Sequence, residues 1–524
     1  MKIKILKLVK VLSVVLVLIW FIFFLNKKTD LTTADLGRHI KNGQVLVHGN
    51  WSERWAVLNT NYYSYTMPEQ PFVNHHWLSG ILFYAIYSFS GFAGLSVLYL
   101  LFGVLTLALF FKLAAEKAGV FFTSFVSIVL TPLLASRTEV RPEILTYFFT
   151  AAFFYLLYRF NTGKQKKAVW FLPTLMLLWV NLHIGFVFGF LVLGAFFVES
   201  FLKAFVLKRH EARRKTQTIF WVGVVSLLAS LLNPHFIKGV LYPLNIFKNY
   251  GYLIVENQSI KFLENLNMAA GQNFFLFKAV AVATCASFIL AYIFSKKFSL
   301  ALFLVTLVSG VLAYKGIRHF PSFAFFAFFS LCLNLAELQK SAKRNGIILG
   351  PKEAVAIPVM LFVLVLSLNA GFNGIRAKQS VLGLGLLPGT QASAEFFKKE
   401  GLSGPIFNDY DIGGYLAYNL PEKVFVDNRP EAYTVDFFEN VYKPMQQVPE
   451  KWTQFLNEFQ FNTIFFSHRD YTPWAQTFLI SRVVDEAWAP IYVDGYNIIF
   501  LRRTDANKSI IEKYEIPKSN FGIR

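Results

Sequence analysis

The opening stretch MKIKILKLVKVLSVVLVLIWFIFFL, residues 1–25, decides the fold class of this chain. Its lysines lie in the first ten residues, and they precede an apolar run long enough to cross a bilayer as a helix. The run lacks the small-residue cleavage site of a secretory signal. We therefore expect an uncleaved membrane anchor whose basic end stays in the cytoplasm.

The composition of the whole chain is that of a polytopic membrane protein. Of its 524 residues, 55% are hydrophobic and 18% aromatic, whereas 16% are charged. The net charge of the chain is +20, and in a membrane protein such an excess of basic residues usually lies in cytoplasmic loops that face anionic lipid. We therefore do not interpret it as a sign of nucleic-acid binding. Cys285 and Cys332 both lie in apolar runs, which supports neither a disulfide framework nor a zinc site.

The remaining apolar runs predict a topology that agrees with the positive-inside rule. If residues 26–92 (the first loop) lie outside, the connections FKLAAEKAG, NTGKQKK, LKRHEARRKT, FSKKF and LQKSAKRNG all lie inside, and all are basic. Residues 77–89, WLSGILFYAIYSF, are too few for a span, so we predict an interfacial or half-buried helix of the first external loop there. We predict about 11 transmembrane helices, at residues 11–25, 93–112, 119–135, 142–159, 168–182, 184–206, 216–232, 274–294, 298–314, 320–337 and 354–370.

After residue 370 the composition becomes that of a small soluble α/β domain. GPIFND, KVFVDN, NTIFFS and YNIIFLRR have the pattern of strands, and GGYLAYNL and EKWTQFLNEF that of helices. We expect a transmembrane domain over residues 1–375 that includes the first loop. An external α/β domain over residues 380–505 and a loose polar tail over residues 506–524 should follow.

Unusual polar residues gather on the side predicted to be outside. Five segments contribute them besides the first loop: SRTEVRPE, VNLHIG, LNPHF, YLIVENQS and YKGIRHFP. For any one residue, the alternative is ordinary capping or snorkelling at a helix end. Mixed acids, amides, histidines and arginines beside Gly and Pro are nevertheless typical of a site. Most of the histidines fall there: His39, His48, His75, His76, His183, His235 and His319.

Known cofactor motifs are missing from the sequence. It contains no P-loop, GxSxG or nucleotide fingerprint, and VNHHW is too short a pattern to identify a metal. We predict no metal site, while a divalent metal stays open as an alternative.

The stretch TTADLGRHIKNG, residues 32–43, is the strongest candidate for chemistry. On a helix, Asp35 and His39 share one face, one turn apart, and could act as an acid/base pair. The alternative is a solvated amphipathic helix lying along the bilayer surface.

The order of these motifs resembles a known family over nearly the whole chain. YSYTMPEQPFVNHHWLSGILFY, VRPE, LLWVNLHIGF, LLNP and RHFP, followed by NDYDIGGYL and VDNRPEAY, are similar to bacterial GT-C membrane glycosyltransferases of the aminoarabinose and protein mannosyl transferase type. The resemblance implies that Asp35 is the catalytic base. Such relatives carry acids where this chain has Asn74 and His76, in patterns similar to VDHEWLSE. Whether this chain has a second catalytic carboxylate, or a carboxylate that binds a metal, is therefore left open.

The resemblance implies an inverting transferase in the bacterial cytoplasmic membrane. It would move a sugar from a polyprenyl-phosphate donor to a lipid, glycan or protein acceptor on the outer face. A carboxylate would deprotonate the acceptor hydroxyl, and cations would stabilise the leaving phosphate. The competing hypotheses are a transporter or flippase of lipid-linked sugar and a non-catalytic scaffold. The candidate residues are Asp35 and His39 for catalysis, Arg141, Lys315, Arg318 and His319 for the donor phosphate, and Arg38, His75, His76, Asn181, His183, Asn233 and His235 for substrate binding.

Overall fold

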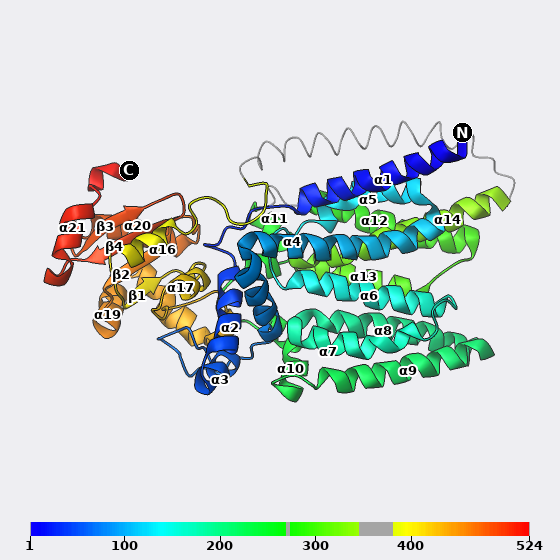
Figure 1. Cartoon of the computed structure of the whole chain (residues 1–524), viewed down its shortest axis with the longest axis horizontal. Helices are drawn as coiled ribbons and strands as arrows, with labels where there is room; N and C mark the ends of the chain where they lie inside the picture. Colours follow the sequence, from blue (N-terminus) through cyan, green and yellow to red (C-terminus); the bar gives the residue numbers. More distant parts are fainter. Residues whose placement is uncertain (1, 269–272, 345–380, 523–524) are drawn as a thin grey trace. The chain divides into compact units, whose positions relative to one another are not determined.

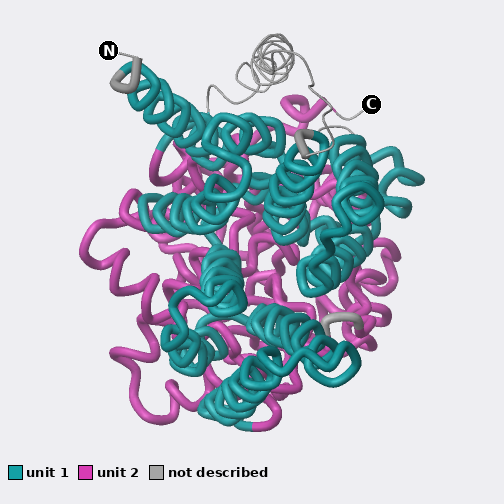
Figure 2. The backbone as a smooth tube through the Cα atoms, turned by 90° about the vertical axis from the view of Figure 1, so that its right-hand side faces the viewer, with its two compact units in different colours: residues 1–27, 96–236, 254–383 teal, residues 28–95, 237–253, 384–524 magenta. Residues whose placement is uncertain are grey.

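The computed structural model describes residues 2–268, 273–344 and 381–522. The chain divides into two compact units (Figure 2). Unit 1 comprises residues 1–27, 96–236 and 254–383, and unit 2 comprises residues 28–95, 237–253 and 384–524. The first loop therefore shares a unit with the C-terminal domain, which differs from the expected division that grouped it with the transmembrane helices.

Unit 1 is built from helices that run alongside one another (Figure 1). Their apolar side chains, many of them aromatic, pack in the interior, where the Phe110 ring stacks on Phe154 and Phe325. The helices are α1 (Lys2–Leu25), the second part of α4 (Trp77–Ala118), α5 (Val120–Leu134), α6 (Glu143–Asn161), α7 (Leu172–Leu182), α8 (Val187–Phe201), α9 (His210–Ser230), α11 (Ile260–Asn265), α12 (Phe274–Leu290), α13 (Leu300–Lys315) and α14 (Phe320–Arg344).

Helices occupy the predicted spans wherever the structure describes them. By length and composition, 5 helices in the described residues could cross a membrane, and three further apolar helices are shorter. These are the lengths and composition of a multi-pass membrane protein. The predicted span at 354–370 lies outside the described residues, so the total of eleven stays a prediction.

Residues 77–89 form a helix, the first part of α4, which a kink separates from the helix that follows. Gly91 has a φ of +62° and a ψ of −162°, which interrupts the helical backbone between the predicted interfacial segment and the predicted span. A left-handed φ is inexpensive only for glycine, so this residue permits the kink.

The C-terminal part of unit 2 contains a mixed four-stranded sheet in the order β1-β2-β4-β3. β1 is parallel to β2, and the other two pairings are antiparallel. Phe407 of β1 contacts the rings of Trp452, Phe461 and Phe478 in a buried aromatic core. The strands are β1 (Ile406–Asn408), β2 (Thr463–Ser467), β3 (Trp488–Val493) and β4 (Asn497–Arg502).

Helices complete unit 2. α2, α3 and the first part of α4 belong to the first loop, and the others follow it in the chain (Figure 1). They are α2 (Leu36–His48), α3 (Trp51–Asn59), the first part of α4, α10 (Phe236–Leu241), α16 (Ala392–Lys399), α17 (Gly413–Asn419), α18 (Pro444–Gln447), α19 (Pro449–Phe459), α20 (Pro473–Val484) and α21 (Lys508–Tyr514).

Two segments of unit 2 differ from the expectation. Residues 423–428, expected as a strand, do not join the sheet. Instead Val424 bridges Ser64, with backbone hydrogen bonds to Tyr63 and Tyr65 of the first loop. The polar tail is not loose, because α21 buries Ile511 and the Tyr514 hydroxyl donates to Glu400 at 2.7 Å.

Asp409, directly after β1, is fully buried. Its Oδ1 accepts from the Ser467 amide at 3.3 Å, while Oδ2 has no hydrogen-bond partner in the described part of the chain. Burial, together with the charges of Asp470 and Asp411, holds the pKa of Asp409 well above its ordinary value. The folded state therefore keeps a proton that the unfolded state releases.

This carboxyl predicts a pH dependence of stability. Because its pKa is raised on folding, Asp409 should destabilise the protein progressively as pH rises above its unfolded pKa of about 4. We expect Asp409→Asn to raise the thermal midpoint at pH 8 and to flatten its fall between pH 5 and pH 8. Asp505→Asn, at an exposed position, is the control. Parallel pH profiles for Asp409→Asn and the unsubstituted protein would contradict the prediction.

Candidate active site

Asp35 stands at the N-cap of α2, within unit 2. An aspartate at this position ordinarily accepts hydrogen bonds from the first backbone amides of the helix, but Asp35 makes no such cap. Its Oδ1 lies 3.5 Å from Nη2 of Arg38, and the Asp35 side chain is 22% exposed. The carboxylate therefore faces a guanidinium and retains access to solvent.

Close packing holds α2 in place. A Cβ on Gly43 would lie 2.0 Å from the Gly80 carbonyl oxygen of α4, and one on Gly37 would lie 2.9 Å from the Tyr418 side chain of α17. Arg38 and His39 are both buried. A solvated surface helix, the alternative considered above, does not fit this burial.

Three histidines of the first loop come together. The rings of His75 and His76 are 4.0 Å apart, and those of His39 and His76 are 5.2 Å apart. The His75 ring also lies 4.9 Å from Tyr242. His39 thus packs among other rings, one helical turn after Asp35 in α2. In the residues described, no group of three or more His, Cys, Asp or Glu side chains could hold a metal ion.

The segment VDNRPEAY supplies residues that sequence reasoning left without a role. Arg429 is buried against Asp427, with 2.8 Å from Nε to Oδ1, and its Nη2 donates to Asn61 Oδ1 at 2.7 Å. Arg38 Nε donates to Asn428 Oδ1 at 3.3 Å. The same segment therefore anchors both the first loop and the arginine that faces Asp35. The signal for these residues in the sequence was the presence of several charged residues in one short segment.

Glu431, in the same segment, brings a second carboxyl to this region. Burial raises its pKa, and the opposing charges of Arg38 and Arg429 do not cancel that effect. Burial and the Glu431 charge together raise the pKa of Tyr250 to about 12. Arg38 thus interacts with a carboxylate from the first loop and with a carboxyl from the C-terminal domain.

In unit 1, the predicted phosphate-binding arginines belong to a cluster of ion pairs, the Arg–Glu cluster. Arg137 contacts Glu143 at 2.6 Å and Glu256 at 2.8 Å. Burial would raise the pKa of Glu256, but Arg141 and Arg137 hold it well below its ordinary value. The members are Arg137, Glu139, Arg141, Glu143, Glu256 and Arg318.

The cations of unit 1 differ in how far carboxylates neutralise them. Arg141 lies 2.8 Å from Glu139 and 3.2 Å from Glu256. Arg318 donates to Asn257 at 2.9 Å, and its carboxylate contact, to Glu143, is long at 3.9 Å. Lys315 is exposed at the end of α13. Arg318 and Lys315 therefore retain more uncompensated charge than Arg141.

His183 takes part in the folding of its own turn. Its Nδ1 accepts from the Gly185 amide at 3.0 Å and lies 2.7 Å from the Thr146 hydroxyl, which accepts from Trp179. A Cβ at Gly185 would lie 2.3 Å from that hydroxyl oxygen, which explains the glycine in LHIG.

The other predicted polar residues of unit 1 also serve helix ends. Asn181 donates to the carbonyls of Leu177 and Leu232. Asn233 bonds within its turn and accepts from the His235 amide. The His319 ring lies 5.9 Å from Phe188. Any substrate role for these residues would be added to a structural one.

Solved structures are among the known proteins that this chain matches. The chain is similar to ArnT. That structure, ArnT from Cupriavidus metallidurans bound to undecaprenyl phosphate, has 12% sequence identity and a TM-score of 0.47 over 94% of this chain and 98% of that one. No protein-family model and no curated protein matches. We carry no residue role over from ArnT to this chain.

Proposed function

We propose that this protein is an inverting glycosyltransferase that moves a sugar from a polyprenyl-phosphate donor to an acceptor hydroxyl on the outer face of the membrane. The observation that carries the proposal is the placement of Asp35. Its carboxylate does not cap its own helix, it is partly exposed, and it faces an arginine that is itself held by Asn428.

The proposed chemistry follows from these groups. Asp35 accepts the proton of the acceptor hydroxyl while the acceptor oxygen forms a bond to the anomeric carbon. The bond from that carbon to the phosphate oxygen breaks, and the phosphate leaves with the electron pair. Attack opposite the leaving group inverts the anomeric centre. Arg38, whose Nη2 lies 3.5 Å from Asp35 Oδ1, orients the carboxylate.

For the donor phosphate, we assign the main charge to Arg318 and Lys315. A leaving phosphate needs cations that carboxylates have not already neutralised. Arg318 meets this requirement better than Arg141, and its planar guanidinium can give a phosphate two parallel hydrogen bonds. His319 and Arg141 would have secondary roles.

The proposal predicts transfer by the purified protein. Incubated in vesicles with a labelled polyprenyl-phosphate sugar and a membrane extract as the source of acceptor, it should move label from the donor into a product with inverted anomeric configuration. NMR of the product would identify the configuration. Movement of the labelled lipid across the bilayer without transfer would support a flippase instead, and the absence of both would support a scaffold.

A further inference from the structure

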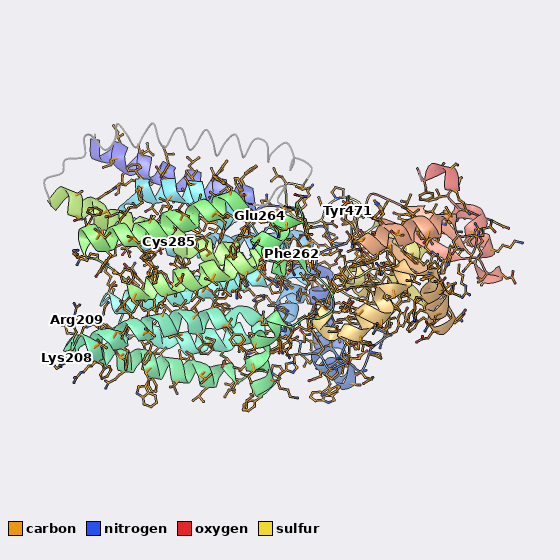
Figure 3. All side chains as sticks on the ribbon, turned by 180° about the vertical axis from the view of Figure 1, so that it is seen from behind. Lys208, Arg209, Phe262, Glu264, Cys285 and Tyr471 are labelled. Atoms are coloured by element: carbon orange, nitrogen blue, oxygen red, sulfur yellow. The ribbon has the colours of Figure 1, made fainter. Side chains whose placement is uncertain are left out.

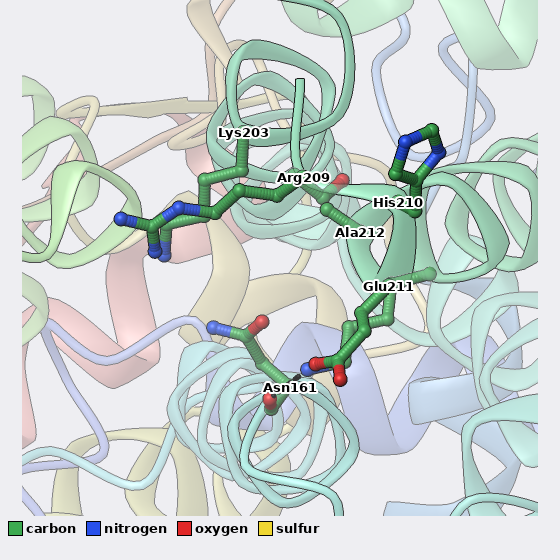
Figure 4. Close-up of a pocket in the computed structure, with 8 residues that line it drawn as sticks. Asn161, Lys203, Arg209, His210, Glu211 and Ala212 are labelled. Carbon is green, nitrogen blue, oxygen red and sulfur yellow. Dashed lines mark hydrogen bonds between the residues drawn. The ribbon is translucent and has the colours of Figure 1, made fainter. Parts of the chain in front are cut away.

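A basic pocket of about 380 Å³ lies in unit 1 where α6 and α8 end and α9 begins. Lys203, Arg209 and Lys215 line it, together with one carboxylate, Glu211. In Figure 4 the side chains of Arg209 and Lys203 extend in the same direction, whereas the His210 ring extends the other way. The lining therefore carries an excess of positive charge.

Two of these cations are tied to the fold, and one is not. Lys203 contacts Glu199 at 2.5 Å, and Lys215 donates to the Asn161 carbonyl at 2.7 Å. Arg209 is exposed and has no carboxylate within 4.0 Å in the part of the chain that the structure describes. Of the three cations that line the pocket, the Arg209 guanidinium is therefore the one best able to bind an anion.

An apolar surface adjoins the pocket. The end of α8 and the single π-helical turn that follows it, Leu202–Val206, expose large hydrophobic side chains. Phe205 is 52% exposed and Val206 63% exposed. A ligand that fills both regions must combine an anionic group with hydrocarbon.

The pocket is separate from the Arg–Glu cluster. Glu143 of the cluster is the first residue of α6, and Asn161 of the pocket is its last, so the two lie about 27 Å apart along the helix. Figure 3 likewise shows Lys208 and Arg209 at one end of the helices of unit 1 and Phe262 and Glu264 at the other. The charges at the two ends of α6 therefore act independently.

We propose that this pocket binds the phosphate headgroup of an anionic phospholipid, with the acyl chains lying along the exposed apolar residues of α8 and Leu202–Val206. Arg209 supplies the main contact to the phosphate, and Lys203 and Lys215 add to the positive electrostatic potential of the pocket. An inorganic phosphate would satisfy the charge but leave the apolar surface uncovered.

Native mass spectrometry of the full chain in neutral detergent tests the proposal. Phosphatidylglycerol should be retained about tenfold more strongly than phosphatidylcholine with the same acyl chains, and Arg209→Gln should weaken that retention about fivefold. Lys297→Gln removes an exposed charge from the loop between α12 and α13 and is the matched control. Retention by this control should stay within about twofold of the unsubstituted protein.

Three results would overturn the proposal. One is equal retention of phosphatidylglycerol and phosphatidylcholine. Another is an equal loss in Arg209→Gln and Lys297→Gln, which would indicate a general attraction to basic loops. The third is displacement of phosphatidylglycerol by millimolar inorganic phosphate, which would assign the pocket to a free anion.

Discussion

Replacing Asp35 with asparagine should lower sugar transfer by about 100-fold or more while the protein still folds. Asparagine keeps the size of the side chain and a carbonyl oxygen, but it cannot accept the proton of the acceptor hydroxyl. Since Asp35 makes no side-chain cap on α2, the helix loses no hydrogen bond of that kind. Initial rates with a labelled polyprenyl-phosphate sugar, measured beside the thermal midpoint, separate catalysis from folding.

Glu53→Gln is the matched control for this substitution. Glu53 completes a capping box with Asn50 at the start of α3, and glutamine preserves that arrangement, so transfer should stay near normal. His39→Gln should lower the rate of sugar transfer less than Asp35→Asn does, because His39 is buried among aromatic rings. Near-normal transfer in Asp35→Asn would remove Asp35 as the base and refute the proposed mechanism.

The second large effect concerns the stability of unit 2. Arg429→Met removes the partner of Asp427, whose side chain is fully buried, and leaves the Asn61 oxygen without this donor. An uncompensated buried charge of this kind costs about 3–5 kcal/mol of unfolding free energy. Urea unfolding followed by pulse proteolysis of the full chain measures the loss.

Two comparisons identify the cause of that loss. The double variant Asp427→Leu with Arg429→Met removes both charges and should recover much of the stability, because a buried pair can be replaced by apolar groups at little net cost. Arg503→Met breaks a half-exposed pair with Glu515 and should cost no more than about 1 kcal/mol. If Arg429→Met and Arg503→Met cost the same, the buried pair does not stabilise unit 2.

The helices of unit 1 could be predicted from the sequence because their pattern is local. A span must be apolar over its whole length and must satisfy its own backbone hydrogen bonds, so a run such as residues 11–25 is sufficient to identify one. The strands β2 and β4 were predictable because each lies in a short apolar run, NTIFFS and YNIIFLRR. Residues 423–428 have the same composition but pair with the first loop, and no local pattern shows which partner a strand takes.

The position of Asp35 on a helix beside Arg38 also follows from the sequence, because neighbours at i and i+3 share a face. The tertiary structure alone decided that Arg38 meets Asn428, 390 residues further along the chain, and that its charge acts on Glu431. It also decided that carboxylates neutralise Arg137 and Arg141, which is why we propose Arg318 and Lys315 as the phosphate ligands. Burial and long-range pairing set the charge that a side chain can offer a substrate. Both arise only when distant segments pack, so residue type and spacing cannot reveal them.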